Sequence, residues 1–277
     1  MIDSLSKVSS ISGFFHEAPT RTPNSGVADG PLTGNGDLGC MVGANERTVR
    51  FYLSKNDFWY SVPQQSGGGV KSLACLELRM DLPRNLHFHA EQKIAHAEIL
   101  ITLSYQNDGN KAQELSIHSY IPHEHNMLVT EITCTKGNPL LTADLIPTPD
   151  PNADFSHKIS GNYVLVSKSY QKPDVLWETH ACAACHVLNY PSTTFRLWEG
   201  ETATIITCVA TNHDTPLYES FVRNMLNLDF EELLPIYLER TCRMVGSFLD
   251  DLGNLSSISA GYRKILVWLT LHTCMLQ

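Results

Sequence analysis

Two short groups of polar and aromatic residues near the N-terminus have types and spacing that suit a sugar-binding site. Asn35 and Asp37 lie in a glycine-rich segment, and Asn56 and Asp57 come just before Trp59. Asn and Asp side chains can bond hydroxyl groups, and an indole face can pack against a pyranose ring. The same residues are also typical of a glycine-rich hairpin with a packed aromatic anchor. The residues by themselves leave both interpretations open.

The element that must position the two groups is a strand between them. Residues 48–53 alternate, with Val49, Phe51 and Leu53 on one face, so we predict a strand that ends before the second group. The glycines at 34, 36 and 39 also have the spacing of a dinucleotide-binding loop. That loop must open a helix, whereas here a strand is expected next, so the dinucleotide interpretation fails.

The segment 31–60 resembles the opening signature of inverting carbohydrate enzymes, namely the α-L-fucosidase type of glycoside hydrolase family 95 and its relatives in family 65. Those families belong to the six-hairpin glycosidase superfamily. The matching positions are Pro31, Gly34, Asn35, Gly36, Leu38, Gly39, Met41, Val42, Gly43, Leu53, Asn56, Asp57 and Trp59.

The resemblance implies an N-terminal β-sandwich that walls one side of a cleft, followed by a helical linker and an α/α barrel. In those families the barrel supplies both the general acid and the general base, so no catalytic residue is expected in this chain. The residues that would contact sugar are Asn35, Asp37, Asn56, Asp57 and Trp59.

Composition excludes several other classes of protein. The 277 residues carry a net charge of −9 and are 43% hydrophobic and 18% charged. These values are typical of a globular protein and argue against nucleic acid or an anionic membrane as a partner. Eight cysteines are too few for a disulfide scaffold. Residues 1–15 lack the features of a signal peptide, so a cytoplasmic location is expected if the N-terminus is complete.

Short alternating segments with turn residues between them predict a mainly β fold, a large antiparallel β-sandwich of supersandwich type, over residues 1–213. Residues 214–253 change to helical spacing, which predicts a helical linker, and the matching region of the two families is also a linker. Residues 254–277 are expected to be the truncated start of an α/α barrel or an unrelated tail. The apolar run Ile265–Leu276 predicts self-association through exposed apolar surface.

Two other patterns suggest cofactors, and neither is favoured. Cys182, Cys185 and His186 match the attachment pattern for c-type haem. They fall inside an alternating strand that puts Cys182 and His186 on one face and Cys185 on the other, so buried strand cysteines are expected instead. The pairs His87/His89 and His123/His125 have spacing that suits zinc, but we expect solvated residues at strand ends. No cofactor and no metal are therefore predicted.

The sequence thus predicts the non-catalytic N-terminal β-sandwich of a carbohydrate-active glycoside hydrolase, inactive alone. Its carbohydrate substrate would be engaged together with a catalytic barrel that this chain lacks. The alternative is a stand-alone β-sandwich module that binds carbohydrate or protein. Enzymatic activity of the chain itself stays open, because the resemblance is to glycosidases while the catalytic barrel is missing.

Overall fold

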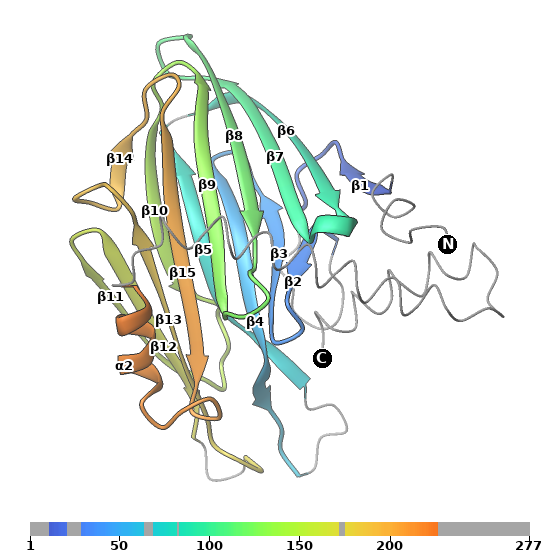
Figure 1. Ribbon diagram of the computed structural model, residues 1–277, viewed down its shortest axis with the longest axis vertical. Coiled ribbons are helices and arrows are strands. Elements are labelled where there is room, and N and C mark those ends of the chain that lie inside the picture. The colour runs from blue at the N-terminus through green and yellow to red at the C-terminus, as the bar shows by residue number, and fades with distance from the viewer. Residues whose placement is uncertain (1–10, 21–28, 64–68, 82, 172–174, 227–277) are drawn as a thin grey trace, which may run out of the picture.

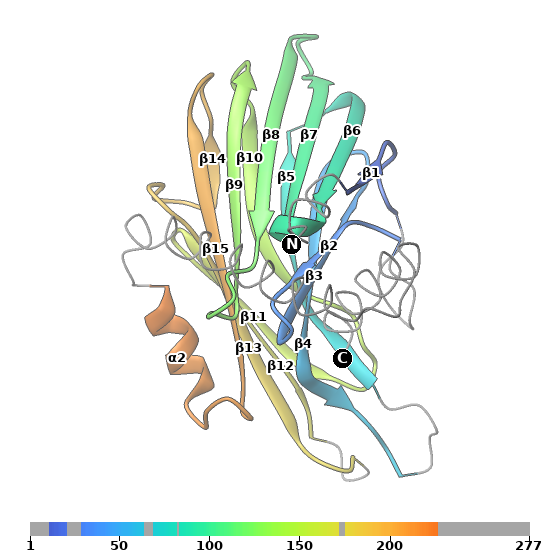
Figure 2. The same cartoon turned by 45° about the vertical axis from the view of Figure 1, so that its right-hand side comes forward.

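Two antiparallel β-sheets stacked face to face form the protein, as the alternating pattern predicts (Figures 1 and 2). The computed structural model describes residues 11–20, 29–63, 69–81, 83–171 and 175–226. In spatial order the nine-stranded sheet contains β1 (Ser12–Phe15), β6 (Arg84–Lys93), β7 (Glu98–Gln106), β8 (Ala112–Tyr120), β9 (Met127–Lys136), β15 (Thr202–Thr211), β13 (Thr179–Val187), β12 (Tyr163–Tyr170) and β11 (Asp154–Ser160). The six-stranded sheet contains β14 (Thr194–Arg196), β10 (Leu140–Pro147), β5 (Gly69–Met80), β4 (Thr48–Tyr60), β3 (Leu38–Ala44) and β2 (Leu32–Gly34).

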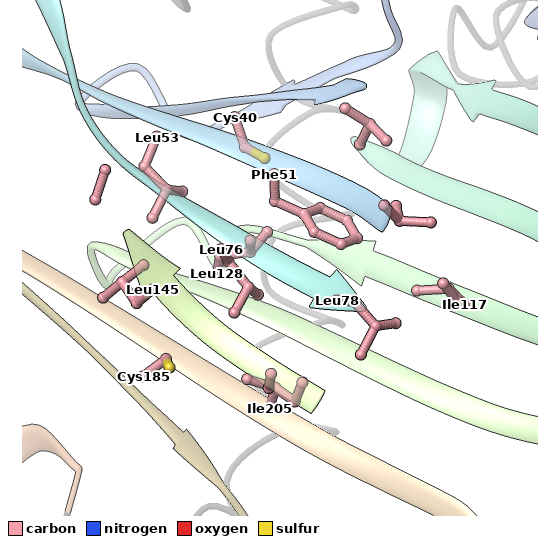
Figure 3. Close-up of a cluster of buried hydrophobic side chains, with 14 of the residues drawn as sticks. Cys40, Phe51, Leu53, Leu76, Leu78, Ile117, Leu128, Leu145, Cys185 and Ile205 are labelled. Carbon is pink, nitrogen blue, oxygen red and sulfur yellow. The ribbon is translucent and has the colours of Figure 1, made fainter. Parts of the chain in front are cut away.

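The core lies between the sheets because each strand turns alternate side chains inward. Figure 3 shows Phe51 and Leu78 of the smaller sheet pointing into the same interior as Ile117 and Ile205 of the larger one. All four side chains are fully buried. This shared core makes the two sheets one packed unit, as expected for a β-sandwich.

The outer face of the nine-stranded sheet carries α2 (Tyr218–Met225), which packs on β13 and β15 (Figure 1). Val222 of this helix is buried against the sheet, whereas Leu217 and Phe221 are exposed. The helix begins where helical spacing was predicted, and the rest of the predicted linker and the 254–277 segment lie outside the described residues. A short 3₁₀ helix, η1 (Ile94–His96), joins β6 to β7. No helix among the described residues is long and apolar enough to cross a membrane.

The structure corrects three sequence predictions about strands. The Ser-, Thr-, Pro-, Gly- and Asn-rich composition of residues 1–30 predicts an irregular lead-in, but residues 12–15 form β1 on the edge of the larger sheet. His87 and His89 lie within β6 and not at a strand end. The strand expected over 48–53 continues to Tyr60, because β4 keeps pairing with β3 through Lys55 and with β5 at Trp59 and Tyr60.

An irregularity in β4 changes which side chains face the core. The pairing with β5 shifts between Leu53 and Trp59. Leu53 and Lys55 are buried, and farther along the strand Phe58 and Tyr60 are buried, so the inward positions change from odd to even numbers between Lys55 and Phe58. A bulge re-aims side chains in this way, because one extra residue reverses the alternation. The predicted residues Asn56 and Asp57 lie in this reversal.

Candidate polar and aromatic site

Asn35 closes the turn between β2 and β3 and fastens it to the other sheet. Its side-chain oxygen accepts hydrogen bonds from the backbone N–H groups of Asp37 (3.0 Å) and Leu38 (2.8 Å). Its amide nitrogen donates to the carbonyl oxygens of Pro122 and His125, both at 3.2 Å, in the loop between β8 and β9. Every polar atom of this side chain is therefore occupied within the protein, which is a structural role.

Lys55 lies at the centre of the site, with its side chain only 1% exposed. Its ammonium group lies 2.9 Å from a carboxylate oxygen of Asp37, 2.9 Å from one of Asp57 and 3.0 Å from one of Asp214. Burial alone would lower the pKa of Lys55, but the hydrogen bonds to the three carboxylates outweigh it and raise that pKa. Lys55 is therefore a buried cation with three anionic partners.

The remaining partners of the three carboxylates come from the other sheet. The second oxygen of Asp37 accepts from the side-chain amide of Asn126, in the β8–β9 loop. Thr211, at the end of β15, donates its hydroxyl to Asp57 (2.8 Å) and its backbone N–H to Asp214 (2.8 Å). The network thus ties the β2–β3 turn and β4 to two elements of the larger sheet. Charged hydrogen bonds at a sheet junction favour one fixed arrangement.

One oxygen of this network has no donor. Asp57 Oδ1 is buried and no described residue hydrogen-bonds to it, whereas Asp57 Oδ2 accepts from Lys55 and Thr211. An unsatisfied carboxylate oxygen is costly and rare in a folded protein. Of the three carboxylates, Asp57 is therefore the one whose capacity to accept hydrogen bonds is unfilled.

Beside Asp57 an open hollow of about 360 Å³ is lined by Asp57, Trp59, Trp177 and His213. Trp59 donates its indole N–H to the carbonyl oxygen of Asn56, which holds the ring in place. Trp177 is 48% exposed, and the neighbouring Leu176 N–H donates to Ser61 O (3.0 Å), which fastens that segment beside the end of β4. Two indole rings, a carboxylate and an imidazole thus surround one open space.

The structure brings the five predicted residues into one region, but it gives them different roles. Asn35 and Asp37 are tied into the network described above. Asn56 is exposed, and its side-chain amide donates to Gly36 O (3.3 Å), across the turn. Asp57 and Trp59 are the two of the five that line the hollow.

Six further residues of the site were not predicted. They are Lys55, Asn126, Trp177, Thr211, His213 and Asp214. Lys55 had a usable signal, because it continues the inward alternation of Val49, Phe51 and Leu53 by one step. A lysine at an inward position requires anionic partners. The other five lie 71–159 residues farther along the chain, and nothing local in the sequence connects them to the site.

The haem-like pattern does not form a cofactor site. Cys182 faces the outer cluster under α2, and Cys185 faces the core between the sheets, as the predicted alternation requires. Both thiols are fully buried, and burial raises the pKa of each to about 12. His186 lies 2.7 Å from the Asn162 side chain and near Leu226 O. Two cysteines on opposite faces of a sheet cannot attach to one porphyrin.

The histidine pairs do not assemble a metal site within the described residues either. His89 of β6 contacts His16, the residue that follows β1, with 3.2 Å between ring nitrogens. His123 and His125 lie in the loop between β8 and β9. No group of three or more His, Cys, Asp or Glu side chains suitable for a metal ion is found in the part of the chain that the structure describes.

The fold defines this chain as a two-sheet antiparallel β-sandwich protein with a polar and aromatic site where the sheets meet. No protein-family model matches the chain, and no curated protein matches it. Among solved structures it is similar to one described as "Putative kojibiose phosphorylase from human microbiome", with a TM-score of 0.45, 7% identity and 77% of this chain covered. The match covers 35% of that structure, so this chain spans about a third of its length.

Proposed function

We propose that this chain is the β-sandwich part of a carbohydrate-active enzyme of the glycoside hydrolase 95 and 65 type, and that its hollow contacts a sugar. The sequence resemblance over residues 31–60 supports the proposal, because three of its matching residues, Asn35, Asp57 and Trp59, lie in the site. The large antiparallel sandwich agrees with the architecture that the resemblance implies. The whole enzyme's reaction, hydrolysis of an O-glycosidic bond, is part of the same proposal.

The observation that carries the proposal is that two indole rings, with a carboxylate and an imidazole beside them, line one open hollow. Trp59 and Trp177 line the hollow, with Asp57 and His213 beside them. Indole faces pack on the apolar side of a pyranose ring, and the exposed His213 imidazole beside them can bond its hydroxyl groups. In this arrangement the Lys55 network has a positioning role, because it holds Asp57 and the turn at residues 35–37.

We further propose that the sandwich does not cleave glycosides by itself. A glycosidase needs two carboxyl groups on opposite sides of the scissile bond, one of which acts as a proton donor. At this site Asp37, Asp57 and Asp214 all contact the same ammonium group, so none is placed opposite another across an open cleft. In the related families the acid and base come from the barrel.

Binding is tested by titrating the chain with neutral mono- and disaccharides in a calorimeter. Trp59→Ala and Trp177→Ala should each weaken binding about fivefold, because the stacking of one aromatic ring contributes about 1 kcal/mol. Trp198→Ala is the matched control, since Trp198 is 57% exposed but lies outside the hollow. Equal affinity of the Trp59 and control variants would refute the proposed sugar contact.

Catalysis is tested separately with chromogenic aryl glycosides. The chain alone should release no more chromophore than buffer does. Turnover that disappears in an Asp57→Asn variant would overturn the non-catalytic proposal while leaving the sugar site in place.

A stand-alone module that binds carbohydrate or protein is the second candidate. The described residues of the two sheets enclose one continuous buried core. A domain with its own core can fold alone, and this favours the second candidate. Reading the transcript beyond codon 277 distinguishes the two candidates. An open frame that encodes several hundred residues of paired helices supports the enzyme part, and a stop codon supports the module.

A further inference from the structure

Strand β11 is the last strand of the nine-stranded sheet (Figure 1). It pairs along its whole length with β12 on one side, from Asp154 opposite Ser169 to Ser160 opposite Tyr163. No described strand pairs with its other side. An exposed strand edge of this length is a template for pairing with another chain.

The backbone groups on this open edge can be identified from the ladder. The carbonyl of Asn162 accepts from Val187 N–H on β13 (3.0 Å), so the even-numbered residues of β12 bond to β13. The odd-numbered residues of β12 therefore bond to β11, and they lie opposite its even-numbered residues. The N–H and C=O groups of Phe155, His157 and Ile159 consequently point toward the open edge.

The side chains of the same three residues lie on the core-facing side of the nine-stranded sheet, beyond the part that the other sheet covers. Their partners on β12 are Lys168, Val166 and Val164, which are all buried between the sheets, and paired residues share a face. Phe155 and Ile159 are nevertheless 59% and 54% exposed. His157 lies between them and is 3.0 Å from Asp144 on β10. Phe155 and Ile159 thus lie beside backbone N–H and C=O groups that no described strand pairs with.

The sequence of β11, DFSHKIS, complements itself when it is reversed about its centre. In an antiparallel pair of two copies centred on His157, Phe155 lies opposite Ile159 and Ser156 opposite Lys158. The negative Asp154 then lies diagonal to the positive Lys158 of the other copy, on the face away from the core. The residues whose backbone groups point toward the open edge form three pairs in this dimer, Phe155 with Ile159, His157 with His157, and Ile159 with Phe155. Each pair would exchange two hydrogen bonds.

We propose that this chain forms a two-fold symmetric dimer in which β11 pairs antiparallel with β11 of a second copy, centred on His157. The two nine-stranded sheets then join into one continuous sheet, and Phe155 and Ile159 of each copy cover those of the other. A two-fold contact of this kind closes on itself, so it yields a dimer and not a fibre. One strand pair is a small interface, and the expected dissociation constant is therefore in the range of about 1–100 µM.

The test is sedimentation velocity of the full chain from about 1 to 100 µM, with thermal unfolding of each variant to confirm folding. His157→Pro removes an outward N–H, which an edge strand tolerates, and should weaken the dimer at least tenfold. Asp154→Lys and Lys158→Asp should each weaken it, because like charges then lie diagonal to each other. The double variant Asp154→Lys/Lys158→Asp restores opposite charges and should recover most of the affinity. Leu217→Lys, which changes an exposed residue at the N-cap of α2, is the control and should leave the dimer unchanged.

Three results would overturn the proposal. The first is a monomer at 100 µM. The second is association that survives His157→Pro and both single charge reversals. The third is association that is lost when residues 254–277 are deleted but is indifferent to every β11 variant, which would place it in the apolar tail.

Discussion

Lys55 is a charged side chain in a position that the sequence pattern reserves for apolar residues. It continues the inward row of β4 and is 1% exposed, and its charge is balanced by Asp37, Asp57 and Asp214. Burying an ion is costly unless every partner stays in place. The residue therefore couples the stability of the sandwich to the geometry of the candidate site.

Replacing Lys55 with Met should destabilise the protein by about 3 kcal/mol, because three clustered carboxylates lose their common cation. Urea unfolding followed by circular dichroism measures the loss. Lys111→Met is the control, since Lys111 is exposed and its side chain makes no hydrogen bond among the described residues. A loss for Lys55→Met no larger than for the control would show that the network contributes little.

His118 provides a second prediction about a single residue, this time about pH. Its ring lies 2.9 Å from Glu131 and 3.5 Å from Glu98, on the two neighbouring strands. Burial alone would lower the pKa of His118, but the hydrogen bond to Glu131 and the nearby carboxylate of Glu98 raise it to about 9. Since the folded value exceeds the unfolded value of 6.5, the stabilisation is complete below pH 6.5 and is lost as the pH rises toward 9.

The measurement is the free energy of unfolding against pH for the natural chain and for His118→Asn. The difference between the two should be about 1–3 kcal/mol near pH 6 and should shrink steadily between pH 6.5 and 9. Lys168, whose buried side chain has its pKa lowered to about 8, changes the stability with pH in the opposite direction. Because Lys168 is present in both proteins, its contribution cancels in the difference. A difference that stays constant across this range would contradict the assignment.

At the scale of elements, two turns that need the same backbone conformation differ in how closely they are packed. Gly36, between β2 and β3, and Gly137, between β9 and β10, both have φ of +91°. A Cβ at Gly36 would meet nothing within 4 Å, whereas one at Gly137 would lie 2.4 Å from Gln113 Oε1 and 2.9 Å from Ala112 O. Gln113 cannot easily move, because it is buried and accepts a hydrogen bond from Asn138 N–H (2.9 Å).

Gly36→Ala should therefore cost about 1–2 kcal/mol, which is the strain of a positive φ in a residue with a side chain. Gly137→Ala should cost at least about 2 kcal/mol more, because a backbone and side-chain clash adds to the same strain. Urea unfolding of the two variants separates the contributions. Equal losses would mean that the β9–β10 turn relaxes around the added methyl group.

Elements differ in how far their sequence predicts them. The alternation predicts strands over residues 97–105, 114–121 and 127–135, and β7, β8 and β9 agree with these ranges to within two residues at each end, because each has one buried and one exposed face. The prolines at 147, 149 and 151 predict a long loop before the next strand at Tyr163, so β11 was missed, since all its residues but Ser160 are exposed and its polar positions resemble those of a loop. The extension of β4 was missed because Asn56 and Asp57 are typical of turns, and pairing with β3 and β5 overrides that tendency.

At the scale of the whole molecule, both sheets depend on one core, and this links the cysteines to global unfolding. The six cysteines of the described residues, Cys40, Cys75, Cys134, Cys182, Cys185 and Cys208, are all unpaired and buried. Burial raises the pKa of each thiol, to about 12 for Cys182, Cys185 and Cys208. A buried neutral thiol reacts slowly with disulfide reagents.

In a Cys242→Ser/Cys274→Ser background, which leaves only the six buried thiols, a chromogenic disulfide reagent should therefore label almost none in the native protein. Labelling of all six should follow the urea unfolding transition, because opening the shared core exposes them together. One or two thiols that react well before that transition would show that part of a sheet opens independently.

The sequence by itself determined that this protein is a large antiparallel sandwich, because a period of two is a local property that each strand carries in its own residues. It also drew attention to the region of the site, since Asn35, Asp37, Asn56, Asp57 and Trp59 lie close together along the chain. Only the tertiary structure decided that Lys55 joins three carboxylates, that Trp177 and His213 meet Trp59, and that β11 ends a sheet with an open edge. Those features depend on strand order and on contacts between the sheets, and such contacts join residues more than a hundred positions apart.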